Sequence, residues 1–158
     1  MSIVSSSIVI AAAPEAVWSV VMDAERLPEW VTIHRAVRNV TPGPPHEGSE
    51  MEQVLHLRGA DLHVRWLLVE CRPPSLARWE GRGPARSTAL IEYRLSAVPE
   101  GTRFDYRNDF QPPFGAVGAL ASRTVMGQVP QREADRSLAA LRALVEREPR
   151  GDGVPATR

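Results

Sequence analysis

Residues 8–18 read IVIAAAPEAVW and pass from the pattern of a strand to the pattern of a helix. The β-branched residues of 3–10 predict a first strand. Pro14 occupies a first helical position, and Glu15 adds a negative charge in the first turn, where the helix dipole favours an acid. Apolar side chains then recur at helical spacing and predict a short amphipathic helix over residues 14–22; they are Val17, Trp18, Val21 and Met22.

A second short helix and a strand are expected after this first helix. Residues 23–30 read DAERLPEW, which predicts a helix at Ala24–Leu27 that ends near Pro28, because the residue before a proline disfavours helical backbone. The next strand is expected at about residues 35–41. Residues 41–48, TPGPPHEG, are rich in turn-forming residues and predict a loop.

The two strands that flank Gly59-Ala60 are expected to form a hairpin with these two residues as its turn. This register gathers apolar side chains on one face of the sheet and charged or histidine side chains on the other. A slip of one residue would mix the two faces. The expected cross-strand pairs include Arg58–Asp61, Leu57–Leu62, His56–His63, Leu55–Val64, Gln53–Trp66 and Met51–Leu68.

A second hairpin is predicted further along the chain, with Pro99-Glu100 at its turn. Aromatic and apolar residues then meet on the inner face and opposite charges on the outer face, which supports the register. A shorter strand around residues 76–82 lies between the two hairpins, so the sheet is mostly antiparallel. The inner pairs are Leu95–Phe104, Tyr93–Tyr106, Ile91–Asn108 and Ala89–Phe110, and the outer pairs are Arg94–Asp105 and Glu92–Arg107.

The chain is predicted to be helical from about Gly115 to Glu148, with Pro130 kinking or interrupting the helix. The tail, residues 149–158, is rich in glycine and proline and lacks apolar periodicity, so we expect it to be disordered. Residues 1–148 are therefore expected to form a single domain.

The order of these elements resembles that of the START-like, or helix-grip, superfamily, in particular the polyketide cyclase/dehydrase branch of the SRPBCC proteins. Residues 8–18, 23–30 and 101–104 (GTRF) carry the resemblance, which extends over about residues 3–147. It implies an α+β helix-grip fold, a curved antiparallel sheet of about seven strands wrapped round a long C-terminal helix, with two short helices after the first strand. In such a fold the sheet and the helix enclose an elongated cavity for a hydrophobic ligand.

The inner face of the predicted sheet is mostly apolar but holds a few polar side chains, which is the usual composition of a small-molecule site. The alternative is that these polar side chains hydrogen-bond one another or water at the ends of the sheet. The predicted ligand-binding residues are Trp30, Gln53, Leu55, Trp66, Leu68, Arg72, Trp79, Ile91, Phe104, Asn108, Phe110, Leu120 and Thr124.

Glu70 is a candidate general acid or base, because the alternation of its strand places it on the inner face with Trp66 and Leu68. A structural ion pair with Arg72, two residues further on, is an equal alternative. Arg72 near the cavity mouth is also a candidate to hold a ligand carboxylate or phosphopantetheine, and the alternative is that it lies on a solvated face.

His34, Tyr93 and Tyr106 complete the candidate catalytic residues. A neutral imidazole at His34, just after the short helices, can move protons at neutral pH. The two phenols can donate a hydrogen bond to a ligand carbonyl. In the alternative interpretation His34 is hydrogen-bonded at a strand start, and the tyrosines are core residues with satisfied hydroxyls.

Charge and cysteine content exclude several other classes of protein. The 158 residues contain nineteen basic residues, all of them arginine, and nineteen acidic residues, so the formal net charge is zero. Without a basic stripe we expect no nucleic-acid partner, and without an apolar run of about 18 residues we expect no membrane span. Cys71 cannot form an internal disulfide, which is typical of a cytoplasmic protein.

No cofactor and no metal are expected. The glycines at 81 and 83 do not precede a helix, as a phosphate-binding loop requires. His56 and His63 lack a convincing third ligand. Cys71 is expected on the outer face with no histidine in phase, which argues against a catalytic thiol.

We therefore predict a protein that binds a hydrophobic small molecule and, like polyketide cyclases and dehydrases, promotes aldol cyclisation and loss of water in a poly-keto intermediate. The inner strand face lacks the dense Trp and Arg lining of the well-marked aromatase/cyclases. The alternative function is a non-catalytic carrier or sequestering protein for a lipid-like metabolite. An acyl-carrier protein is a further candidate partner, and the protein is expected to be a monomer or homodimer.

Overall fold

The computed structural model describes residues 2–112 and 129–148, which form an α+β structure built on one sheet. The elements are β1 (Ser2–Ile10), α1 (Pro14–Val21), η1 (Ala24–Arg26), α2 (Leu27–Trp30), β2 (His34–Arg38), β3 (Glu50–Leu57), β4 (Ala60–Arg72), β5 (Leu76–Arg82), η2 (Pro84–Arg86), β6 (Thr88–Val98), β7 (Gly101–Gln111) and α4 (Val129–Arg147).

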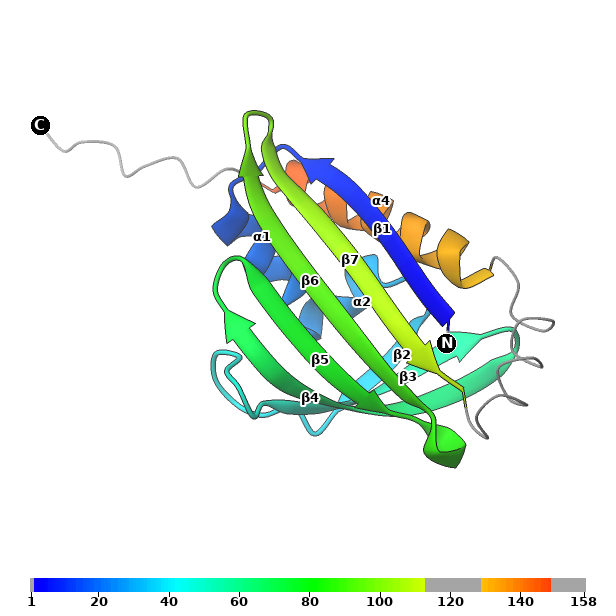
Figure 1. Cartoon of the computed structure of the whole chain (residues 1–158). Coiled ribbons are helices and arrows are strands. Elements are labelled where there is room, and N and C mark those ends of the chain that lie inside the picture. The colour runs from blue at the N-terminus through cyan, green and yellow to red at the C-terminus, as the bar shows by residue number, and fades with distance from the viewer. Residues whose placement is uncertain (1, 113–128, 149–158) are drawn as a thin grey trace, which may run out of the picture.

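The seven strands form one antiparallel sheet in the order β1-β7-β6-β5-β4-β3-β2. The sheet is curved, and the helices lie on one side of it, with α4 packed against β1 and α2 (Figure 1). This arrangement confirms the helix-grip fold. The core fills the space between sheet and helices, where Ile10, Phe104 and Leu141 are completely buried.

The first helix begins as the sequence predicts, with Pro14 in its first turn. The Asp23 side chain caps η1 by accepting a hydrogen bond from the backbone N–H of Glu25, at 3.0 Å. The short helix predicted at Ala24–Leu27 is η1, but the expected break near Pro28 is absent, because helical backbone continues and Pro28 lies in the first turn of α2. A proline is tolerated there since the first-turn N–H groups have no partner within the helix.

The turn between β3 and β4 lies one residue earlier than predicted. Arg58 and Gly59, with φ of 51° and 77°, form the turn, and Leu57 pairs with Ala60. Two-residue hairpin turns favour positive φ at both central residues and glycine at the second. Every pair is therefore displaced, and His56 faces Asp61 instead of His63. The inner face keeps its predicted residues, because a shift of one residue on each strand preserves the alternation.

A β-bulge between Leu68 and Glu70 reverses the alternation for the rest of β4. Glu70 pairs with Arg78 and Cys71 with Ala77, so Glu70 points to the outer face and Cys71 to the buried side. The positions expected for both residues are therefore wrong, since the extra residue of a bulge shifts the facing of all that follow it.

The register of the hairpin between β6 and β7 is confirmed, with Tyr93 opposite Tyr106 and Ile91 opposite Asn108. The ion pairs on its outer face differ from the expected cross-strand pairs. Glu92 pairs with Arg94 and with Arg78 of β5, and Asp105 pairs with Arg103. Residues two apart on a strand share a face, so an arginine can pair along its own strand, as Arg94 and Arg103 do, as well as with the residue opposite, as Arg78 does with Glu92.

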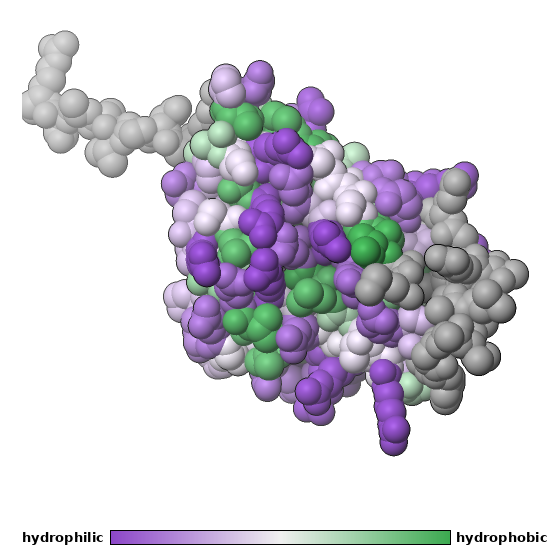
Figure 2. Space-filling model, viewed as in Figure 1, coloured by the Kyte–Doolittle hydropathy of each residue, from purple (hydrophilic) through white to green (hydrophobic). Residues whose placement is uncertain are grey.

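The outer face of the sheet is largely hydrophilic, with hydrophobic side chains in separate patches (Figure 2). Leu67 and Leu90 are exposed hydrophobic residues of this face. The strand expected at 35–41 is β2, which ends at Arg38. The part of the C-terminal helix expected before Val129 and the tail at 149–158 lie outside the described residues, and Pro130 lies in the first turn of α4.

Candidate functional site

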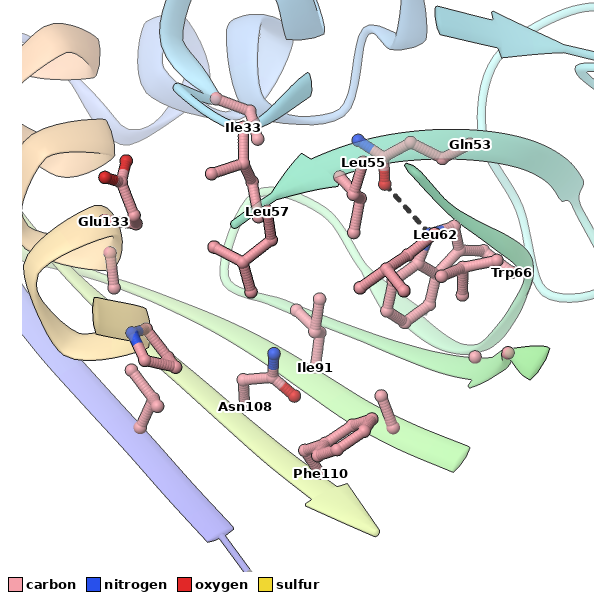
Figure 3. Close-up of a pocket in the computed structure, with 18 of the residues that line it drawn as sticks. Ile33, Gln53, Leu55, Leu57, Leu62, Trp66, Ile91, Asn108, Phe110 and Glu133 are labelled. Atoms are coloured by element: carbon pink, nitrogen blue, oxygen red, sulfur yellow. Dashed lines mark hydrogen bonds between the residues drawn. The ribbon is translucent and has the colours of Figure 1, made fainter. Parts of the chain in front are cut away.

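A cavity of about 740 Å³ lies between the inner face of the sheet and helices α2 and α4. Its wall is mostly apolar: Ile91 and Phe110 project into it from β6 and β7, and Leu55, Leu57 and Leu62 from the opposite strands (Figure 3). This volume is in the range of sites for drug-sized ligands, which are also mostly apolar with a few polar groups.

A chain of three polar side chains supports one wall of the cavity. Trp66 Nε1 donates a hydrogen bond to Gln53 Oε1 at 2.9 Å, and Gln53 Nε2 lies 2.9 Å from His34 Nδ1 (Figure 3 shows the first of these). The indole can only donate, so the Gln53 oxygen must face it and the amide N–H must face His34. Gln53 thereby fixes both the position of Trp66 and the acceptor role of His34 Nδ1.

His34 lies behind this wall and is not among the residues that line the cavity. Burial lowers the pKa of its imidazole below the ordinary value, which favours the neutral form. A neutral ring with Nδ1 as acceptor carries its proton on Nε2. His34 can therefore influence a ligand through Gln53 and Trp66.

Tyr93 and Tyr106 are cross-strand neighbours, and both line the cavity. Burial raises the pKa of the Tyr106 hydroxyl to about 12, against the opposing effect of a hydrogen bond from Asn108. Burial also raises the pKa of Tyr93 well above its ordinary value. Both phenols therefore keep their protons at neutral pH and can donate a hydrogen bond to an acceptor.

Two buried polar atoms at the cavity have no hydrogen-bond partner among the described residues, Trp30 Nε1 and Asn108 Oδ1. The Trp30 ring packs edge-on against Tyr93, with the ring centroids 6.3 Å apart. A buried donor or acceptor left without a partner costs about 1–3 kcal/mol. Both atoms have almost no accessible surface, so they are unsatisfied groups buried behind the surface of the cavity wall.

Glu133 is a site residue that the sequence interpretation missed. It projects from α4 at the cavity and is the one carboxylate among the described lining residues (Figure 3). Its Oε2 accepts a hydrogen bond from Thr32 Oγ1 at 2.6 Å, and Arg136 lies 3.3 Å from Oε1. Helical periodicity carries the signal, because Glu133 lies on the same face as Ser137, four residues further on, which also lines the cavity.

Several predicted ligand-binding residues lie in the cavity wall. They are Trp30, Gln53, Leu55, Trp66, Trp79, Ile91, Asn108 and Phe110. Leu68 and Phe104 are instead completely buried in the core. Leu120 and Thr124 lie outside the described residues.

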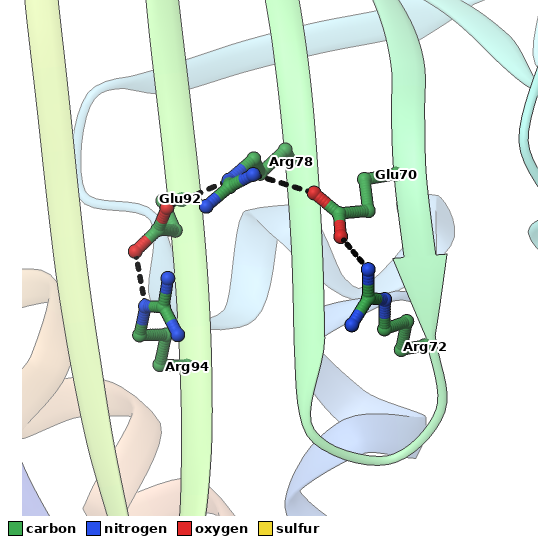
Figure 4. Close-up of polar contacts among 5 residues, drawn as sticks. All are labelled: Glu70, Arg72, Arg78, Glu92 and Arg94. Atoms are coloured by element: carbon green, nitrogen blue, oxygen red, sulfur yellow. Dashed lines mark hydrogen bonds and ion pairs between the residues drawn. The ribbon is translucent and has the colours of Figure 1, made fainter.

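Glu70 and Arg72 lie on the outer face of the sheet, in a chain of ion pairs (Figure 4). Glu70 pairs with Arg72 at 2.8 Å and with Arg78 at 2.6 Å. Arg78 continues the chain to Glu92, which also pairs with Arg94. The alternative pairing of Glu70 with Arg72 is therefore found, and the two side chains face away from the cavity.

Among the described residues, no group of three His, Cys, Asp or Glu side chains is arranged to hold a metal ion. His56 pairs with Asp61 at 2.6 Å, and Arg35 joins the same carboxylate at 2.8 Å. Within residues 2–112 and 129–148, no helix has the length and apolar character that crossing a membrane requires.

A seven-stranded antiparallel sheet that curves round a long helix, with an apolar cavity between them, defines a helix-grip protein. The chain belongs to the family described as "Polyketide cyclase / dehydrase and lipid transport", which it matches over residues 1–146.

Two curated relatives come from Mycobacterium tuberculosis and are named "Toxin Rv0910" (strain H37Rv) and "Toxin MT0934" (strain CDC 1551). Each is 30% identical to this chain over 131 residues, which cover 82% of this chain and 91% of the relative.

Solved structures share the fold at low sequence identity. A protein from Thermus thermophilus matches with a TM-score of 0.72 and 17% identity, over 91% of this chain and 97% of that one. A protein from Chromobacterium violaceum matches with a TM-score of 0.69 and 18% identity, over 94% of this chain and 100% of that one.

Proposed function

We propose that this protein binds a hydrophobic small molecule in the cavity between sheet and helix, and that the ligand carries a carbonyl or another hydrogen-bond acceptor. The observation that carries the proposal is the mostly apolar cavity of about 740 Å³ with two protonated phenols in its wall. Apolar walls supply binding energy in proportion to the area they remove from water, and a few polar groups orient the ligand.

The phenols of Tyr93 and Tyr106 are suited to an acceptor because their raised pKa values keep them protonated. A ligand carbonyl directed at this part of the wall gains a hydrogen bond that a matched hydrocarbon cannot make. Each such bond is worth about 0.5–1.5 kcal/mol.

The test compares two ligands of similar shape, acetylnaphthalene and ethylnaphthalene, in displacing the dye Nile red from the purified protein. We expect the ketone to bind more tightly than the hydrocarbon. Tyr106→Phe and Tyr93→Phe should weaken the ketone by about twofold to tenfold, the equivalent of one hydrogen bond, and leave the hydrocarbon nearly unchanged. If the variants lose affinity equally for both ligands, the proposed hydrogen bond to a ligand acceptor is contradicted. If no ligand shows saturable binding, the proposed binding function is contradicted as well.

A second candidate function is catalysis of an intramolecular aldol condensation, and the position of Glu133 favours it. The reaction needs a base to take the proton from the carbon next to one carbonyl and a donor to stabilise the developing oxyanion at the other. Glu133 provides a carboxylate that lines the same cavity as the two phenols, from α4 rather than from the sheet. Loss of water from the aldol then gives the cyclic enone.

The appropriate assay follows a linear diketone whose intramolecular aldol product is a cyclohexenone, by the ultraviolet absorption of the conjugated enone. Catalysis predicts saturable formation of enone that falls at least tenfold in Glu133→Gln, while that variant still binds acetylnaphthalene. If the protein binds ligand but neither the wild type nor a variant forms enone, catalysis is contradicted. The function is then that of a carrier or sequestering protein, which needs no base.

A further inference from the structure

A second hollow of about 610 Å³ lies on the other side of the cavity wall and is not used by the proposed function. We call it the outer cleft. It is bounded by residues 18–25, from the end of α1 into η1, and by residues 40–45 of the loop that follows β2.

The outer cleft and the main cavity share part of their walls. Leu27, Met51, Trp79 and Tyr93 line both hollows. A side chain that contacts two hollows is the whole thickness of the wall between them at that point. The two spaces are therefore separated by a single layer of side chains.

Met51 is the member of this layer that can most readily move. Leu27, Trp79 and Tyr93 are buried in the core, whereas Met51 is only partly buried and packs at the margin of the core. Methionine is unbranched, has three rotatable bonds and adapts to irregular spaces. A change of the Met51 rotamer is thus the simplest way to join the two hollows.

We propose that the outer cleft receives the hydrocarbon tail of the ligand, which passes Met51 from the main cavity. This inference rests on the proposed function, which places the acceptor group of the ligand in the main cavity, because it places the tail of that same ligand in the outer cleft. It narrows the ligand class to long-chain amphiphiles with the polar group in the main cavity and an unbranched apolar chain at the opposite end.

The composition of the outer cleft supports an apolar occupant without negative charge. Trp18, Val21 and Met22 contribute apolar surface, together with the prolines of the loop. The charged residues among its described lining are all acidic: Asp23, Glu25 and Glu50. A ligand carboxylate or phosphate would be repelled there, whereas a hydrocarbon chain is not.

Hydrogen bonds hold the loop side of the cleft in place. Thr41 N donates to Glu50 O at 2.9 Å, and Glu50 N donates to Thr41 Oγ1 at 2.8 Å. His46 N donates to Ser49 Oγ at 3.0 Å, and Cys71 Sγ contacts Pro45 O at 3.7 Å. The cleft is therefore formed by a loop tied to the sheet.

The test measures binding of a homologous series of saturated methyl ketones of increasing chain length, by displacement of Nile red. Each added methylene that enters an apolar space should tighten binding by about fourfold. Ser19→Phe fills the cleft from an exposed position, and Met51→Phe thickens the wall. Ser96→Phe is the matched control, because Ser96 is exposed and lines neither hollow.

We expect the ratio of long-chain to short-chain affinity to fall at least tenfold in both Ser19→Phe and Met51→Phe and to be unchanged in Ser96→Phe. Circular dichroism and urea unfolding confirm that each variant is folded. The wild-type series by itself shows whether affinity rises with the chain length of the ketone. Two results would overturn the tail assignment alone, provided that short ketones still bind. In the first, affinity does not increase with chain length in the wild type. In the second, the increase persists in both Ser19→Phe and Met51→Phe. Failure of every ketone to bind would overturn the proposed function as well.

Discussion

The ring of Trp66 occupies the space that a side chain at Gly81 would need. These residues are cross-strand neighbours on β4 and β5, and a Cβ placed on Gly81 would lie 2.5 Å from Trp66 Cζ3. Gly81 is thus the cavity residue that lets the indole lie close to the sheet, where its Nε1 reaches Gln53. The shape of the cavity depends on this close approach.

Gly81→Ala should displace the Trp66 ring and lower the free energy of unfolding by about 1–3 kcal/mol, the usual cost of overpacking. Urea denaturation measures the loss. In a Trp66→Leu background the same substitution should cost much less, because the clashing ring is gone. Equal costs in both backgrounds would show that Gly81 is needed for another reason.

Gln53→Leu should leave Trp66 Nε1 without an acceptor in a buried position. We expect a loss of about 1–3 kcal/mol in the free energy of unfolding, together with a change in tryptophan fluorescence. Leucine is apolar and has one side-chain heavy atom fewer than glutamine, so most of the packing is kept. Neutral stability with unchanged fluorescence would contradict the role of Gln53 in fixing the indole.

The lowered pKa of His34 predicts a pH dependence of stability. Its folded-state pKa lies below the ordinary 6.5, so the unfolded chain binds more protons as the pH falls through that value. This contribution to stability is complete above 6.5 and is lost progressively as the pH falls towards the folded-state pKa.

The measurement compares urea unfolding of wild type and His34→Gln between about pH 7.5 and pH 5.5. Glutamine can still accept the Gln53 hydrogen bond but does not titrate, so the variant should show a smaller decrease. The carboxyl groups of Asp61 and Glu92, whose pKa values are also lowered, titrate below this range. Identical decreases in the two proteins would remove His34 as the cause.

Much of the fold could be predicted from the pattern of apolar and polar residues, which repeats every two residues in strands and about every 3.6 residues in helices. The β6–β7 hairpin is the clearest case, because the aromatic pair Tyr93–Tyr106 and the charged residues on the other face agree on one register. The β3–β4 hairpin shows the limit of this signal. Moving its turn from Gly59-Ala60 to Arg58-Gly59 changes every pair but leaves each side chain on its face.

Features that depend on local irregularity or on distant contacts could not be predicted in this way. The bulge at Val69 exchanges the faces of Glu70 and Cys71, and no alternation pattern reports an inserted residue. Glu133 becomes a cavity residue only because α4 lies beside α2, where Thr32 can reach it. The outer cleft depends on how the loop after β2 lies against the α1–η1 segment.

Cavity filling tests the central claim, that a ligand occupies the space between sheet and helix. Ile91 projects into the cavity (Figure 3), and its chain neighbour Leu90 is exposed on the outer face. Ile91→Trp and Leu90→Trp therefore add the same side chain to opposite faces of one strand. Nile red and acetylnaphthalene titrations are compared with the free energy of unfolding in urea.

We expect wild type and Leu90→Trp to bind one dye per chain with similar affinity, and Ile91→Trp to bind at least tenfold more weakly while remaining as stable as the wild type. Unchanged binding in Ile91→Trp would contradict the location of the ligand. A loss of about 1–3 kcal/mol in the stability of Ile91→Trp, typical of an overpacked core, would contradict the presence of an open cavity.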